Sequence, residues 1–113
     1  MTSKQLSKII AGLASDKKAE EIVILEMKDV VNFCDYFVIC SGTTDRHVGG
    51  ISDNIEDGLH ELGIKSKLKQ GVKKSDWVVF DLGDVVTHVF QKQSRKFYAL
   101  EYLWQEAKRI ELE

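Results

Sequence analysis

The stretch DYFVICSGTTDRHV, residues 35–48, decides the fold class, because it joins an apolar run to a helix start through a short turn. The run DYFVIC lacks polar alternation, which is typical of a strand buried on both faces. Apolar residues then recur at steps of three and four, as on one buried helix face: Val48, Ile51, Ile55, Leu59 and Leu62. We expect Thr43 or Thr44 to cap this helix and Gly63 to end it. A buried strand followed by an amphipathic helix predicts an α/β domain.

The residues before this stretch predict one helix and one further strand. Thr2 and Gln5 have the spacing of a capping box, and apolar residues follow at helical intervals up to Leu13. The segment 21–27, EIVILEM, is a second short apolar run. We therefore expect a helix near residues 2–18 and a buried strand at 21–27.

The residues after it predict three strands and a last helix. Lysines alternate with other residues in KSKLKQ, 65–70, as on an edge strand protected against aggregation. Residues 77–80 and 85–90 are two strands whose short link predicts an antiparallel hairpin. Ser94 is expected to open a helix whose buried stripe comprises Phe97, Leu100, Leu103, Trp104 and Ala107. The order αββαβββα predicts one α/β domain over residues 1–113, with a mixed sheet of about five strands and flanking helices.

Composition and charge exclude several classes of protein. The 113 residues suffice for one core, and no apolar run approaches the ~20 residues that a membrane span needs. The first ten residues have neither a signal-peptide h-region nor the pattern of a transit peptide, so we expect a cytoplasmic protein. A net charge of -2 argues against binding nucleic acid mainly through charge.

The cysteines and histidines do not predict a metal or cofactor site. Cys34 and Cys40 lie in apolar sequence and are expected to be reduced packing residues. His47, His60 and His88 lack the spacing of a zinc site. We expect neither a metal nor a cofactor.

Two turns carry residues with more than one interpretation. The SGTT turn, 41–44, precedes a helix and can either hold a phosphate, with Arg46 nearby, or simply cap the helix. Asp81 and Asp84 flank the hairpin turn, where they can serve turn chemistry, surface recognition or metal binding. Their separation of three residues disfavours a shared metal.

Two side chains on the hairpin strands and one basic segment also need an interpretation. His88 is expected to be half-buried and hydrogen-bonded rather than a catalytic base. Trp77 is either a core residue or a binding anchor, and the sequence favours neither. The lysines at 65, 67, 69, 73 and 74 form either a solvated face or an RNA contact.

Three ordered motifs resemble the ribosomal silencing factor family RsfS, also called Iojap. They are CDYFVICSGTTDRHV at 34–48, WVVFDLGDVVTHVF at 77–90 and RKFYALEYLW at 95–104. Together they span most of the chain and are far more specific than any single pattern above. The resemblance implies a nucleotidyltransferase-like fold without catalysis, hence a binding module and not an enzyme.

The resemblance also implies a partner and a mechanism. Members of the family dock on ribosomal protein uL-fourteen of the large subunit, block joining of the small subunit and repress translation. It further implies a role in large-subunit biogenesis and a homodimer when free, and we expect at most a minor contact with ribosomal RNA. We expect the docking residues to be Trp77, Asp81 and Asp84, with Tyr98 and Tyr102 as weaker candidates. The alternatives are a metal-dependent nucleotidyltransferase and an RNA-binding module that uses residues 65–74.

Overall fold

The computed structural model describes residues 1–65, 68–70 and 76–110, with the backbone alone at 68–70, 97, 98 and 100. Its elements, in chain order, are α1 (Ser3–Ser15), β1 (Glu20–Glu26), β2 (Tyr36–Gly42), α2 (Asp45–Glu61), β3 (Leu68–Gln70), β4 (Trp77–Asp81), β5 (Val85–Gln91), α3 (Lys92–Tyr98), α4 (Leu100–Leu103) and β6 (Lys108–Ile110). Within the described residues, no helix combines the length and apolar character that crossing a membrane requires.

The strands form one mixed sheet in the order β3-β4-β5-β2-β1-β6. The central strands β2 and β5 pair in parallel, whereas the other described pairs are antiparallel. The predicted mixed sheet, the hairpin of β4 and β5 and the edge position of β3 are therefore confirmed. The sheet has one strand more than expected, because Lys108–Ile110 pairs with β1. A three-residue strand is too short to show an alternating pattern in the sequence.

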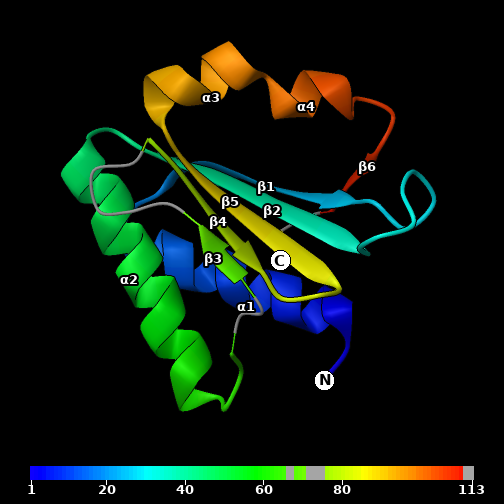
Figure 1. Ribbon diagram of the computed structural model, residues 1–113, viewed down its shortest axis with the longest axis horizontal. Helices are drawn as coiled ribbons and strands as arrows, with labels where there is room; N and C mark the ends of the chain where they lie inside the picture. Colours follow the sequence, from blue (N-terminus) through cyan, green and yellow to red (C-terminus); the bar gives the residue numbers. More distant parts are fainter. Residues whose placement is uncertain (66–67, 71–75, 111–113) are drawn as a thin grey trace.

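Helices cover the two faces of this sheet unequally (Figure 1). The long helices α1 and α2 lie on one face, which we call the closed face, and bury a core that includes Ile10, Ile51, Ile55, Val38 and Phe80. The short helices α3 and α4 arch over the other, half-covered face. A second cluster lies there, formed by Leu25, Met27, Cys34, Phe37, Ile39, Phe90 and Ala107. The two buried cysteines are free, as predicted, with Cys40 in the closed-face core.

Side-chain caps start α1 and α2 as the sequence predicts. The Thr2 hydroxyl accepts from the Gln5 N–H at 3.1 Å, and Gln5 Oε1 accepts from the Thr2 N–H at 2.8 Å. Thr44, not Thr43, caps α2, since its hydroxyl accepts from the His47 N–H at 3.0 Å. Gly63 follows α2 with φ +74°, a conformation in which glycine is favoured.

The prediction of one continuous last helix from Ser94 to Ala107 is wrong. The helix begins at Lys92 and breaks at Ala99, whose φ of 49° and ψ of 45° are left-handed. Leu103, expected in the buried stripe, is 63% exposed. Tertiary contacts replace the helical pattern here, because Arg95 donates from Nε to Glu101 at 2.7 Å and from Nη1 to Ser41 at 2.8 Å.

Candidate docking face

The hairpin of β4 and β5 presents a row of side chains on the half-covered face. Successive residues of a strand point to opposite faces, so Trp77, Val79 and Asp81 share this face. Phe90, His88 and Val86 lie directly opposite them on β5. Trp77, Val79 and Val86 remain partly exposed, which distinguishes this row from the closed face.

Trp77 is neither fully buried in the core nor fully exposed. Its indole stacks on Phe90, with ring centroids 4.9 Å apart and planes at 25°. Its Nε1 donates a hydrogen bond to His88 Nδ1 at 3.1 Å. The ring thus packs against the edge of the second cluster and keeps part of its surface exposed.

His88 lies deeper in this face than the sequence predicted. Its side chain is 6% exposed, and burial lowers its pKa from 6.5 to about 4. Phe37 packs edge to face against the imidazole, with centroids 4.8 Å apart. The predicted hydrogen bond is present, to Trp77, whereas Nε2 has no partner among the described residues. His88 is therefore a buried, neutral hydrogen-bond acceptor.

Three carboxylates gather at the end of the sheet where β4 passes into β5. Burial, followed by the charges of Asp35, Asp81 and Asp84, raises the pKa of the Cys34 thiol to about 11. All three carboxylates therefore lie near one buried sulfur, and we call them the acidic end. Asp81 also serves the turn, since its Oδ1 accepts from the Gly83 N–H at 2.8 Å. The turn interaction expected for this pair is therefore made by Asp81, whereas the side chain of Asp84 is exposed.

One exposed aromatic residue next to the acidic end was missed by sequence reasoning. Phe33 is 59% exposed, and its ring lies 6.3 Å from that of Phe37, centroid to centroid. The sequence held a signal for its exposure, because Phe33 lies between the two predicted strands, just before Cys34 and Asp35, and belongs to neither strand pattern. An exposed aromatic ring beside carboxylates is typical of a binding surface.

The two tyrosines predicted as weaker docking residues do not extend the row. Tyr102 is 72% exposed on α4 and lines a separate cavity of about 260 Å³ with Arg95 and Glu101. The side chain of Tyr98 lies outside the described part of the structure. The structure therefore places Trp77 and Asp81 on one face, at opposite ends of β4, with Asp84 in the turn beyond Asp81.

The SGTT turn offers little to a phosphate group. The Thr43 N–H donates to His47 Nδ1 at 3.0 Å, and the His47 N–H is taken by Thr44. His47 Nε2 lies 2.8 Å from the carbonyl oxygen of Lys17 and donates to it. A Cβ at Gly42 would lie 2.8 Å from the Val48 nitrogen, so only glycine fits this close approach. These contacts favour the interpretation that the turn caps α2 and ties it to the segment that follows α1.

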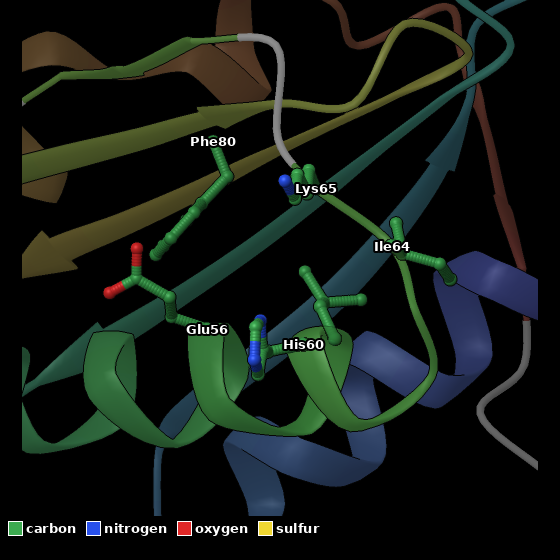
Figure 2. A pocket seen from close by; sticks show the side chains of 6 residues that line it. Glu56, His60, Ile64, Lys65 and Phe80 are labelled. Atoms are coloured by element: carbon green, nitrogen blue, oxygen red, sulfur yellow. The ribbon is translucent and has the colours of Figure 1, made fainter.

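A cavity of about 300 Å³ lies between α2 and β4, on the closed-face side of the sheet (Figure 2). Glu56 and His60 stand one turn apart on α2, Lys65 follows the helix, and Phe80 comes from β4. Across the described residues, no group of three or more His, Cys, Asp or Glu side chains is arranged to hold a metal ion. Most of the lysine segment 65–74 lies outside the described residues.

Comparisons with known proteins agree on one family. A family model described as "Ribosomal silencing factor during starvation" matches residues 1–113. The chain is 42% identical to the ribosomal silencing factor of Bacillus subtilis over 113 residues, which cover 100% of this chain and 96% of that protein. It is also 29% identical over 100 residues to the Mus musculus protein named "Mitochondrial assembly of ribosomal large subunit protein 1", covering 85% of this chain and 43% of the relative.

A solved structure supports the same conclusion. The crystal structure of a Bacillus halodurans protein superposes with a TM-score of 0.85 at 38% identity, covering 96% of this chain and 99% of that one. The motifs at 34–48, 77–90 and 95–104 thus lie in a chain that the family model matches from end to end. The chain belongs to the ribosomal silencing factor family.

Proposed function

We propose that this protein binds ribosomal protein uL-fourteen on the large ribosomal subunit and thereby blocks joining of the small subunit and represses translation. The observation that carries the proposal is the partly exposed Trp77, held on the half-covered face in one row with Asp81. Tryptophan is enriched among residues that dominate binding energy. Membership of the ribosomal silencing factor family supports the choice of the ribosome as the partner.

The charge of the face suits such a partner. A ribosomal protein is expected to be basic, and complementary charge steers association and selects partners. The carboxylates of Asp35, Asp81 and Asp84 gather at one end of the Trp77 row. We therefore assign Trp77 as the apolar anchor and Asp81 and Asp84 as contacts for lysine or arginine side chains.

In this mechanism the protein acts only by occupying its binding site on the large subunit, and no chemical reaction takes place. A protein seated on the intersubunit face excludes the small subunit by its volume, without a metal or cofactor. The name of the mouse relative refers to assembly of the large subunit, which supports a second role in biogenesis through the same contact. A cytoplasmic location, a homodimer when free and a nucleotidyltransferase-like fold without catalysis belong to the same proposal.

Sedimentation of purified ribosomal subunits tests the proposal. Small and large subunits are mixed at associating magnesium concentration, with and without the protein, and each gradient fraction is probed for it. We expect the protein to migrate with large subunits and the peak of joined ribosomes to shrink. Unchanged joining with no protein on the large subunit would contradict the proposal.

The variant Trp77→Ala tests the assigned anchor. Loss of a hot-spot tryptophan costs roughly 2 to 4 kcal/mol, or about 30- to 1,000-fold in affinity. The matched control is Leu62→Ala, since Leu62 is an exposed apolar residue at the end of α2, away from the half-covered face. A folded Trp77→Ala protein that binds as tightly as the control would rule out the assignment.

Two titrations address the alternative functions. Heat on mixing with nucleoside triphosphate and magnesium at millimolar concentration would favour a nucleotidyltransferase. RNA affinity that falls steeply with salt and depends on the lysines between 65 and 74 would favour an RNA-binding module.

A further inference from the structure

We propose that His88 is a positioning residue for Trp77: it fixes the indole flat against the sheet, in the orientation that the docking partner meets. The inference rests on the proposed docking role of Trp77 and adds a residue that does not itself touch the partner. It follows from the contacts between β4 and β5.

Two contacts from β5 fix the indole in different ways. Trp77 lies opposite Phe90, and His88 is its diagonal neighbour on the same face, within reach of a long side chain. Stacking on Phe90 sets the plane of the indole, with the two planes at 25°. The 3.1 Å hydrogen bond from Nε1 to His88 Nδ1 selects which edge of the indole faces His88, because a half-turn flip about the Cβ–Cγ bond would keep the plane but move Nε1 away. Stacking on Phe90 does not by itself distinguish these two orientations.

The hydrogen bond fixes the state of the imidazole. An indole N–H only donates, so Nδ1 of His88 must be unprotonated to accept it. Burial also favours the neutral ring, as the lowered pKa of about 4 indicates. Neutral His88 then carries its proton on Nε2.

That Nε2 proton argues for a role beyond stability. His88 is 6% exposed, and Nε2 has no hydrogen-bond partner among the described residues. A buried donor without a partner is destabilising, whereas an apolar residue of similar size would carry no such cost. The useful atom at this position is therefore Nδ1, the acceptor for Trp77.

The arrangement also defines what Trp77 presents to a partner. Because the indole N–H is bonded within the protein, the exposed part of the side chain is apolar ring surface. A ring face attracts lysine or arginine cations as well as aliphatic groups. This matches the basic partner that the acidic end, at the other end of β4, favours.

Two substitutions separate positioning from stability. His88→Leu removes the acceptor and the unpartnered donor together, whereas His88→Asn keeps an acceptor oxygen close to the position of Nδ1. We expect His88→Leu to be at least as stable as the parent in urea unfolding but to bind large subunits about 5- to 10-fold more weakly, as expected for a lost hydrogen bond. We expect His88→Asn to be less stable and yet to bind within about 2-fold of the parent, since it keeps the bond.

This opposite ranking of stability and binding is the decisive result. A purely structural role for His88 predicts that binding follows stability in both variants. The matched control is Thr87→Val, a change at the neighbouring buried residue on the closed face, which should leave binding unchanged. In a Trp77→Ala background, His88→Leu should have no further effect on binding, because the residue that it positions is absent.

A measurement on the free protein keeps the inference separate from the docking proposal. In a Trp104→Phe background, the fluorescence anisotropy decay reports on Trp77 alone. His88→Leu should increase the local motion of the indole, and His88→Asn should not. If the parent does not bind large subunits, the docking proposal fails, and this decay still decides the positioning role. Equal indole motion in all three proteins would overturn it.

Discussion

The closed and half-covered faces of the sheet differ in what covers them and in what they leave exposed. On the closed face, two long amphipathic helices bury Ile51, Ile55 and Phe80 completely. On the half-covered face, a seven-residue helix and a four-residue helix leave Trp77 and Val86 partly exposed. The same sheet therefore has one face that is buried throughout its centre and one that keeps partly exposed apolar side chains, which is the face that we propose for docking.

The largest expected difference between the faces is in the cost of removing buried atoms. Ile51→Ala, in the centre of α2, should lower the free energy of unfolding by about 3 to 5 kcal/mol, because it leaves a cavity in a fully buried site. Urea unfolding measures this loss. The folded fraction should bind large subunits normally, so a matching loss of affinity would contradict the division between the two faces.

The pH dependence of stability tests the half-covered face. The pKa of His88 is about 4 in the folded protein and near 6.5 when unfolded, so the unfolded state binds more protons between these values. Stability from this group is therefore complete above pH 6.5 and falls as the pH drops towards 4, by up to about 3 kcal/mol.

The measurement is the difference in unfolding free energy between the parent and His88→Leu at several pH values. This difference removes the contribution of the carboxylates, which titrate in both proteins. We expect the parent to lose stability relative to the variant below pH 6.5. A difference that stays constant from pH 7 to 4 would show that His88 remains accessible to protons.

A smaller effect concerns the segment that covers the half-covered face. Arg95 is 6% exposed and links α3 to Glu101 and to Ser41 of β2. Arg95→Ala should cost about 2 to 3 kcal/mol, below the range for a fully buried ion pair because Glu101 stays 25% exposed. Arg109→Ala is the control, since this exposed residue reaches Glu101 at 3.5 Å and should contribute less than about 0.5 kcal/mol. If urea unfolding showed the same loss of stability for both variants, Arg95 would contribute no more to the fold than the exposed Arg109.

The smallest expected effect comes from a closed-face residue of β5, the strand that also carries His88 on the half-covered face. Thr87 is fully buried on the closed face, and its Oγ1 has no partner among the described residues. Thr87→Val has the same shape without the hydroxyl and should raise the free energy of unfolding by about 1 kcal/mol. Thermal unfolding detects this gain as a higher Tm. A loss of stability would indicate that the hydroxyl has a partner after all.

Much of the fold could be predicted because its signals are local. The capping box of Thr2 and Gln5, the Thr44 cap and the short link in the β4–β5 hairpin are all set by residues within a few positions of one another. The break at Ala99 could not be predicted, because no glycine or proline marks it. Arg95 and the pairing of β6 with β1 act there over long sequence distances.

The candidate docking face was predictable only in part. Alternation along a strand places Trp77 and Asp81 on one face, and the hairpin register brings His88 close to Trp77. Sequence alone did not show how far each side chain is buried, since that depends on the helices above the sheet. For this reason His88 lies deeper than predicted, while Phe33 and Leu103 are exposed.

The sequence by itself determined the family, the α/β class, the capping box of α1 and the hairpin that carries Trp77, because motifs and short-range periodicity specify these features. Only the tertiary structure decided that the last helix breaks, that a sixth strand forms and that the indole of Trp77 is bonded to a buried histidine. Those features depend on which distant segments pack together. The same packing decides how far each side chain is buried, and burial keeps the His88 imidazole neutral.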